Sequence, residues 1–480
     1  MNDRSTKVPT GGPHEQRLRA LDGIRAFAVT AVILFHAGIT AVSGGLLGVD
    51  VFFVLSGFLI TSLLCTEHGR SGSIRLGRFW AARARRLLPG LFVLLIGIAV
   101  FAWIFRQTLD LSSIRGDAIA TLLYVANWHF ILSGQSYFEQ ALAPSPLLHM
   151  WSLAVEEQYY LVWPLVAVFV LSKKGPRGLA LVASIGAALS ALLMAVMFLE
   201  GFSTDRLYYG TDTRAQALLV GSALGALASQ REWRVIPQGW AENRTGRVSG
   251  TLMWVTGAAA LIWFWHDLNG QNPFLYEGGF LLVALASGAV ITNVTSWRSS
   301  VLSKFLSLGS ITYIGRISYG LYLYHWPLFL AIDHAHTGMS GATLLAVRLA
   351  ATLAAAVVSF HLIEQPIRRG AFAKTWRGLG IAGATAAATC VVIVVATIPP
   401  AFANVEVARE PTHITDTERR LLAEHHAFTT NPIRFLLVGD SVALTAGEGL
   451  RVESQQRYGV RIFDWGIAGC DLTTDATVVY

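Results

Sequence analysis

Charged residues are scarce in this chain of 480 residues. Only 14% are Asp, Glu, Lys or Arg, whereas 53% are hydrophobic, and the mean hydropathy is +0.50. Soluble globular proteins carry about 25% charged residues. This shortage excludes an ordinary soluble protein. It predicts an α-helical integral membrane protein, because apolar stretches of about 20 residues recur along the chain.

Cysteine is rarer still, and Cys65, Cys390 and Cys470 are scattered far apart. Their spacing excludes a disulfide framework and a cysteine-based metal site, and we expect no metal. Internal repeats are lacking too, including the inverted repeats typical of transporters. The formal net charge of +7 lies mostly in short loops. Such a distribution is typical of membrane proteins and does not require a nucleic-acid partner.

Eleven apolar stretches are long enough to be transmembrane helices. They are 20–41, 46–65, 87–105, 148–171, 178–199, 208–229, 251–266, 277–296, 311–333, 342–366 and 379–399. A twelfth stretch, 116–133, contains Asp117 and His129 and is ambiguous.

The charges of the loops decide how that stretch is interpreted. The most basic loops are 66–86, 172–177, 230–250, 297–310 and 367–377. If 116–133 crosses the membrane, the last four of these loops lie outside, against the positive-inside rule; if it is re-entrant or interfacial, all five lie inside. We therefore predict about eleven crossings, a cytoplasmic tail over residues 1–19, and an extracytoplasmic location for everything after Pro400.

The composition changes after the membrane part, 20–400. Residues 401–431 are polar and charged, which indicates an extracytoplasmic linker. Within 432–480, two β-type runs at 433–438 and 460–465 flank a helical stretch and predict a β-α-β unit. An α/β domain needs roughly 100 residues to bury a core, so we expect only its N-terminal fragment here.

Two polar side chains interrupt the first apolar stretch. Arg25 and His36 are eleven residues apart, which places them on one helix face, roughly 16 Å apart along the axis. Ionisable groups in a membrane usually face a bundle interior and act there. A neutral imidazole is also a natural general base for a hydroxyl. The structural alternative is that each side chain extends to the nearer membrane surface; we favour the functional interpretation.

Four motifs in this order resemble the acyltransferase 3 family. They are the R-x10-H pair Arg25 and His36, and the segments 48–60 (GVDVFFVLSGFLI), 151–160 (WSLAVEEQYY) and 317–327 (ISYGLYLYHWP). The resemblance extends from residue 15 to about residue 370. It implies a bundle of membrane helices that takes an acyl group, commonly acetyl, from cytoplasmic acyl-CoA. The acceptor it implies is a hydroxyl of an extracytoplasmic cell-envelope glycan or glycolipid.

The resemblance also implies roles for individual residues. It makes His36 and Arg25 required, with Arg25 steadying the cofactor within the bundle. The family's R-x-x-R element matches Arg83 and Arg86, which it links to the CoA donor. Guanidinium groups do bind phosphate bidentately, although a basic loop here is also what topology alone requires.

Three other ionisable residues are left with open roles. Glu156 and Glu157 are adjacent, so they point about 100° apart on a helix and at most one is expected to face a site. The sequence does not choose between them. For His325, close to an outer helix end beside a tryptophan, a place in the aromatic belt is a reasonable interpretation.

Gly439-Asp440-Ser441 follows the first predicted strand. A serine at a strand-to-helix turn lies where the helix dipole and backbone N–H groups can stabilise an oxyanion, although an ordinary turn explains the same residues. The segment resembles block I of the SGNH hydrolase/transferase family, which implies that Ser441 is a nucleophile. Residues 466–470 (GIAGC) resemble its glycine block. The family's Asp-x-x-His pair would fall beyond Tyr480, and a serine without its base is poorly activated, so we expect this truncated part to be inactive by itself.

These patterns favour an O-acyltransferase of the plasma membrane. His36 would either activate the acceptor hydroxyl directly or help to pass the acyl group to Ser441, and both routes stay open. One rival is a transporter or flippase of a lipid-linked glycan or acyl donor without chemistry of its own, against which the missing inverted repeat counts. Another is a membrane anchor for a secreted esterase, for which eleven helices with buried charges are too many. The acceptor glycan and the acyl chain length are not specified by the sequence.

Overall fold

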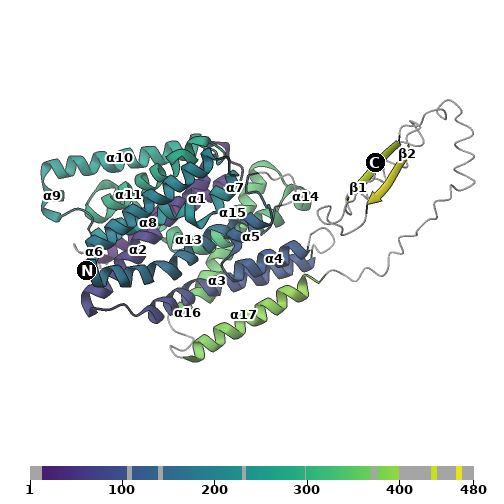
Figure 1. The fold of residues 1–480 in the computed structure, drawn as a ribbon, viewed down its shortest axis with the longest axis horizontal. Coiled ribbons are helices and arrows are strands. Elements are labelled where there is room, and N and C mark those ends of the chain that lie inside the picture. The colour runs from purple at the N-terminus through teal and green to yellow at the C-terminus, as the bar shows by residue number, and fades with distance from the viewer. Residues whose placement is uncertain are drawn as a thin grey trace, which may run out of the picture. The chain divides into compact units, whose positions relative to one another are not determined.

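The computed structural model describes residues 13–104, 111–138, 144–229, 234–297, 299–368, 376–398, 434–439 and 461–466. The chain divides into two compact units, Met1–Pro400 and Ala401–Tyr480. The described part of the first unit is built from helices, and the described part of the second consists of two strands (Figure 1).

The described helices of the first unit differ widely in length. In chain order they are α1 (Pro13–His36), α2 (Gly48–Ser71), α3 (Leu76–Ile104), α4 (Leu111–Leu122), α5 (Ala126–Leu132), α6 (Trp151–Leu199), α7 (Thr204–Tyr209), α8 (Thr211–Ser229), α9 (Gln238–Glu242), α10 (Arg244–Asp267), α11 (Phe280–Ser296), α12 (Val301–Leu306), α13 (Gly309–Ala331), α14 (His334–Thr337), α15 (Gly341–Ser359), α16 (Gln365–Arg368) and α17 (Trp376–Ala396). Short 3₁₀ or π-helical segments lie between or beside these helices, at Thr40–Val42, Gly45–Leu47, Leu148–Met150, Leu275–Gly279 and Phe360–Glu364.

Six stretches of the described chain are long and apolar enough to cross a membrane. They are Gly45–Ser71, Leu76–Ile104, Leu148–Leu199, Arg244–Asp267, Leu275–Ser296 and Gly341–Arg368. Four more of the predicted spans overlap in sequence with helices α1, α8, α13 and α17. The number of crossings stays a prediction.

The third of these stretches, Leu148–Leu199, is too long for a single crossing. Its 52 residues would extend about 78 Å as one helix, more than twice the ~30 Å hydrocarbon core of a bilayer. Within it, α6 is interrupted at Gly175, where φ is 63°, and Pro176 follows. Glycine adopts this left-handed conformation readily, and proline cannot continue the hydrogen-bond pattern of a helix. The break falls between the predicted spans 148–171 and 178–199.

The ambiguous stretch 116–133 does not form one continuous helix. It contains the end of α4 and all of α5, separated by a turn in which Tyr124 has a φ of 56°. These helices have 12 and 7 residues, or lengths of about 18 Å and 10 Å. Neither helix is long enough to cross a bilayer by itself.

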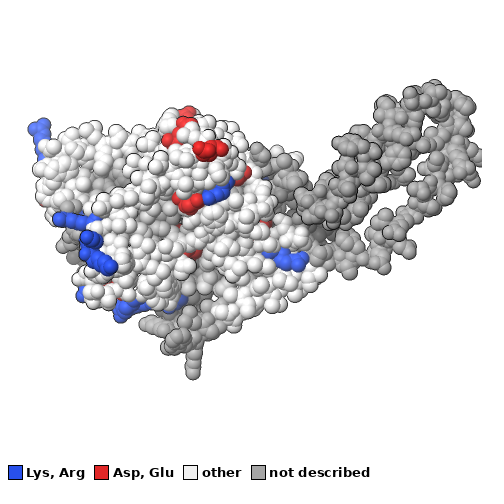
Figure 2. All heavy atoms as spheres, viewed as in Figure 1, with Lys and Arg blue, Asp and Glu red and all other residues white. Residues whose placement is uncertain are grey.

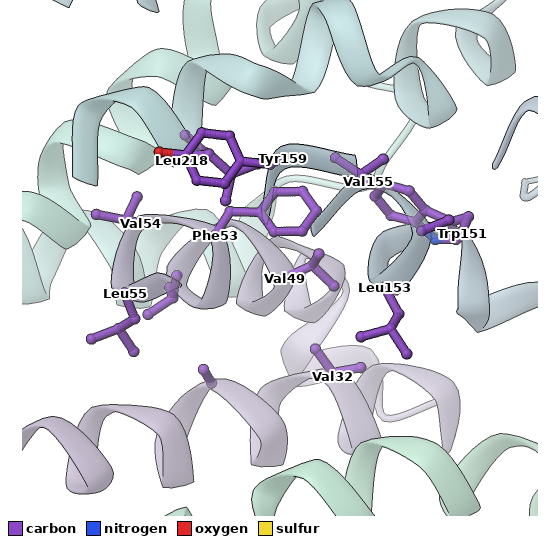
Figure 3. Close-up of a cluster of buried hydrophobic side chains, with 14 of the residues drawn as sticks. Val32, Val49, Phe53, Val54, Leu55, Trp151, Leu153, Val155, Tyr159 and Leu218 are labelled. Atoms are coloured by element: carbon purple, nitrogen blue, oxygen red, sulfur yellow. The ribbon is translucent and has the colours of Figure 1, made fainter. Parts of the chain in front are cut away.

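Helix α2 lies at the centre of the packing. It packs closely against α8, which in turn packs against α6, while α1 packs against α13 and α2. Figure 3 shows this core, in which Phe53 and Val54 of α2 lie near Trp151 and Tyr159 of α6 and near Leu218 of α8. Most of α2 is buried, as expected of a helix that is apolar on all sides.

Glycines allow α2 and α8 to approach each other closely. A Cβ atom at Gly57 would overlap the carbonyl oxygen of Leu218, and one at Gly221 would overlap that of Val54. Small residues serve this purpose at helix interfaces in membranes.

Replacing Gly57 with alanine is therefore expected to destabilise the protein by about 1–3 kcal/mol, the usual effect of overpacking. The measurement is the thermal unfolding midpoint in detergent. Gly97→Ala is the matched control, because nothing lies within 4 Å of its Cβ position in α3 and alanine favours a helix. An equal drop in both variants would contradict the close-packing explanation.

Basic side chains gather toward one end of the first unit. Exposed lysines and arginines flank the turn between α2 and α3, the break in α6 and the start of α10: Arg70, Arg75, Arg78, Lys173, Lys174, Arg177, Arg244 and Arg247. In Figure 2, Lys and Arg are seen mainly on the side where Figure 1 places α9, whereas most visible Asp and Glu lie toward α7. The positive-inside rule predicts this asymmetry if the α9 end faces the cytoplasm.

The second unit contains β1 (Arg434–Gly439) and β2 (Arg461–Gly466). They pair in parallel, with Arg434 opposite Arg461 and Gly439 opposite Gly466. These bounds lie within one residue of the predicted strands 433–438 and 460–465. Parallel neighbours need a crossover connection, and the residues that would form it, 440–460, lie outside the described residues.

Candidate functional site

A cavity lies between helices α1, α2, α3, α6 and α13. It encloses about 730 Å³ of space between protein atoms, including space open to solvent. Its apolar side includes Val49, Phe53 and Leu153, which belong to the cluster in Figure 3. Its polar lining consists of Arg25, Ser56, Arg83, Arg86, Ser152, Glu156, Tyr160, Ser318, Tyr319 and Tyr322.

The three arginines predicted to bind the cofactor all line this cavity. Arg25 comes from α1, and Arg83 and Arg86 come from α3. Glu156 is the one carboxylate among the lining residues, so positive charge predominates. Such a lining suits a ligand with several negative charges.

Two of these arginines have partners that fix their orientation. Arg25 forms an ion pair with Asp22, with 3.1 Å between Nη1 and Oδ1. The Arg83 guanidinium packs over the Tyr160 ring, 5.1 Å from its centre. Arg86 differs, because its Nε is buried and has no hydrogen-bond partner in the described part of the chain. A guanidinium with an unused donor can bind a phosphate oxygen.

The choice between Glu156 and Glu157 follows from which of them lines the cavity. Glu156 does, and its Oε1 accepts hydrogen bonds from the hydroxyls of Ser56 and Tyr160. Glu157 is not among the lining residues. The rotation of α6 about its own axis decides this, and the packing of α6 against α8 sets that rotation.

His36 lies at the last residue of α1, outside the cavity lining. It is partly buried and surrounded by aromatic rings. The ring centres of His325 and Trp326 lie 5.0 and 4.9 Å from that of His36. Its Nε2 lies 3.0 Å from the Tyr137 hydroxyl, and its Nδ1 lies 3.0 Å from the Val32 carbonyl oxygen and 3.1 Å from His325 Nε2.

These contacts determine which ring nitrogen of each imidazole carries the proton. A carbonyl oxygen only accepts, so His325 Nδ1, 2.7 Å from the Tyr322 carbonyl, must donate. In a neutral His325 ring, Nε2 then holds a lone pair. His36 Nδ1 donates to the Val32 carbonyl by the same argument and shares its hydrogen with His325 Nε2. His36 Nε2 is consequently the basic nitrogen and accepts from the Tyr137 hydroxyl.

The interpretation of His325 as an aromatic-belt residue is wrong. His325 is 0% exposed, because α13 turns this side chain toward α1 and into the bundle. The sequence reasoning also missed His149, which is 1% exposed and whose ring centre lies 5.5 Å from that of His325. Its place two residues before the 151–160 motif was the available signal.

Tyr322 connects the cavity with these histidines. It lines the cavity, and its ring centre lies 5.5 Å from that of His325. Its hydroxyl donates to the His149 carbonyl oxygen at 2.8 Å and lies 2.6 Å from Ser152 Oγ. The arginine-lined cavity and His36 are thus connected through Tyr322 and His325.

A buried ion pair lies between α2 and α8. Arg214 Nη2 of α8 lies 2.9 Å from Asp50 Oδ2 of α2, and both residues are 1% exposed. The guanidinium also packs over the rings of Phe280, Tyr208 and Trp151, at 4.0, 4.9 and 5.6 Å from their centres. This pair joins the two helices that form the centre of the fold.

The remaining predicted site residue, Ser441, lies outside the described residues, as do 467–470 of the GIAGC segment. Within the described ranges, no group of three or more His, Cys, Asp or Glu side chains is arranged to hold a metal ion.

Comparison with known proteins identifies the membrane part. Residues 18–364 match the acyltransferase 3 family, described as an acyltransferase domain. The chain belongs to this family. The matched range contains the whole cavity lining, His36, His149 and His325. Arg25 and His36 thus lie in an acyltransferase domain.

Several relatives of this acyltransferase are named as O-acetyltransferases. The peptidoglycan O-acetyltransferase OatA of Listeria monocytogenes is 38% identical over 368 residues, which cover 75% of this chain and 57% of the relative. The O-acetyltransferase OatA of Staphylococcus aureus is 37% identical over 74% of this chain and 58% of its own length. The putative peptidoglycan O-acetyltransferase YrhL of Bacillus subtilis is 36% identical over 75% of this chain and 56% of its own.

The chain spans a little over half of the length of these relatives. No solved structure matches it.

Proposed function

We propose that this protein is a multi-pass O-acyltransferase of the plasma membrane. It moves an acyl group, in the simplest case acetyl, from cytoplasmic acyl-CoA to a hydroxyl of an extracytoplasmic cell-envelope glycan. Family membership supports acyl transfer in a membrane. The names of the relatives support acetyl as the group and peptidoglycan as the acceptor. The observation that carries the donor assignment is the cavity in which Arg25, Arg83 and Arg86 meet.

The proposed topology has eleven crossings, with the N-terminus and the α9 end in the cytoplasm and the second unit outside. It rests on the basic loops and on the break in α6 at Gly175. Arg83 and Arg86 lie in the first half of α3 and within the most basic segment, 66–86, so the cavity lies toward the cytoplasmic side. His36 ends α1, roughly 16 Å beyond Arg25 along the helix.

The donor then lies with its phosphates on the arginines and its thioester directed past Tyr322 toward His36. Once the attacking hydroxyl has taken the place of the Tyr137 hydroxyl at His36 Nε2, this nitrogen takes its proton as the oxygen bonds to the thioester carbonyl carbon. The carbon–sulfur bond breaks, and the proton passes from His36 to the departing thiolate. The products are the ester and free CoA.

The attacking hydroxyl belongs either to the glycan or to Ser441 of an SGNH-type domain. In the second case, the acyl group is then transferred from Ser441 to the glycan. Ser441→Ala, made in a protein that carries a whole SGNH-type domain, separates these routes when label from acyl-CoA is followed onto the glycan. Loss of labelled glycan would show that the acyl group passes through Ser441, and unchanged labelling would show direct transfer to the glycan.

Replacing Arg86 with alanine is expected to raise KM for acyl-CoA about 10- to 100-fold, the range for losing one hydrogen bond to a charged group. The kcat value should change little, because the phosphates lie far from the reacting carbonyl. The measurement is acyl transfer in membrane vesicles at several concentrations of acyl-CoA.

Arg85→Ala is the matched control, since Arg85 is the next residue in α3 and does not line the cavity. Equal KM values for the two variants would exclude the cavity as the place where the phosphates bind.

A further inference from the structure

The proposed base, His36, is held from a second helix by another imidazole. His325 of α13 is completely buried, and its Nε2 lies 3.1 Å from His36 Nδ1. Its own Nδ1 donates to the Tyr322 carbonyl at 2.7 Å, which leaves Nε2 as an acceptor. The Val32 carbonyl also accepts from His36 Nδ1, but it belongs to the same helix as His36. Among the described residues, only His325 connects this N–H to another helix.

We propose that His325 is the positioning residue of His36. By accepting the Nδ1 hydrogen it holds the His36 ring so that Nε2 faces the reacting hydroxyl, and it stabilises the imidazolium that forms when Nε2 takes the proton. This inference rests on the proposed function and adds a residue to it. His325 does not touch the substrate; it acts through His36.

The chemistry of the surroundings explains why a neutral group has this role. In serine hydrolases a carboxylate orients the histidine and stabilises its charged form. A lone carboxylate inside a membrane bundle would be costly while His36 is neutral. A neutral imidazole avoids that cost at rest, and its hydrogen bond to His36 strengthens when His36 becomes positively charged.

The neighbouring groups leave His325 free for this contact. His149 lies beside it, but its Nε2 donates to the Leu323 carbonyl at 3.1 Å, and its Nδ1 has no hydrogen-bond partner in the described chain. Trp326 packs on His36 at 4.9 Å between ring centres, while its Nε1 donates to the Ser145 carbonyl oxygen. Within the described residues, neither side chain forms a hydrogen bond with His36.

Because the contact is strongest in the transition state, its loss is expected to lower kcat and leave KM for acyl-CoA nearly unchanged. The test compares His325→Met with His325→Gln in the full chain, in membrane vesicles supplied with labelled acetyl-CoA. Methionine and glutamine have similar shapes, but only the glutamine amide oxygen is a good acceptor. We expect a 10- to 100-fold loss of kcat for methionine, the range for a hydrogen bond to a charged group, and recovery of most of it for glutamine.

His361→Met is the control, because His361 is exposed and, within the described residues, its ring meets the Tyr313 hydroxyl and the rings of Tyr313 and Phe360. Equal losses in His325→Met and His325→Gln would show that only the ring shape matters and would overturn the proposal. Unchanged kcat in His325→Met, or a change confined to KM, would overturn it as well. If His36→Ala keeps full activity in the same assay, the proposed function itself fails, whatever the His325 variants do.

A second readout covers the case in which His325→Met does not accumulate. Nitrogen-15 resonances of the histidine rings in the wild-type protein report which nitrogen is protonated. We expect Nδ1 of His36 to be protonated and Nε2 to be unprotonated. The opposite tautomer would overturn the assignment without any activity measurement.

Discussion

Replacing His36 with alanine is expected to lower kcat for acyl transfer about 10²- to 10⁴-fold, the usual contribution of a general base. KM for acyl-CoA should stay within a few-fold of the wild-type value, since His36 does not line the arginine-lined cavity. The measurement is steady-state transfer of labelled acetyl from acyl-CoA in membranes that hold equal amounts of each protein.

His266→Ala is the control for this experiment. Its side chain is 65% exposed and pairs with the neighbouring Asp267, so its loss should leave kcat unchanged. If His36→Ala transferred acetyl at a rate close to that of the wild type, the base assignment would be wrong. The transporter interpretation would then gain support.

Replacing Arg214 with methionine is expected to destabilise the membrane part by about 3–5 kcal/mol, because it leaves the Asp50 carboxylate buried without its partner. The double variant Asp50→Leu/Arg214→Met should recover much of this loss, since two apolar side chains can replace a buried pair. The measurement is the thermal unfolding midpoint in detergent.

Arg206→Met is the matched control. Arg206 pairs with Asp212 at 2.7 Å, but these side chains are 20% and 36% exposed, so about 1 kcal/mol or less is expected. If Arg206→Met and Arg214→Met lowered the midpoint equally, burial would not be the property that makes the Asp50–Arg214 pair important. A double variant as unstable as Arg214→Met would contradict the explanation by an unpaired carboxylate.

Local composition predicts much of the helical part of this fold. The hydropathy of 46–65 and 251–266 is sufficient to locate α2 and α10, and loop charge identified 116–133 as exceptional. The exact form of that stretch, two short helices with a turn at Tyr124, depends on packing against α6 and α7, which no local pattern encodes.

The site was predictable only in part. The motifs indicated Arg25, Arg83 and Arg86, and the structure brings these three to one cavity. The sequence could not show that His325 meets His36, because 289 residues separate them and the contact depends on how α1 packs against α13. Each histidine has an ordinary structural explanation by itself; the hydrogen bond between them is what indicates a joint role.

For a related reason, the sequence could not show whether Glu156 or Glu157 faces the cavity. Neighbours on a helix point about 100° apart, and only the packing of α6 decides which of them faces inward. In contrast, Ser441 was singled out by a local strand-to-turn pattern, and its role stays a prediction because it lies outside the described residues.

In the proposed reaction, an acyl group enters from cytoplasmic acyl-CoA and leaves on a glycan outside. The most direct test uses sealed membrane vesicles of known orientation that carry the protein, with labelled acetyl-CoA supplied on one side and the glycan on the other. We predict labelled glycan only when the donor is on the side of the basic loops, and at least a 100-fold loss with His36→Ala. Equal labelling with the donor on the opposite side, or labelling that does not depend on His36, would contradict the account.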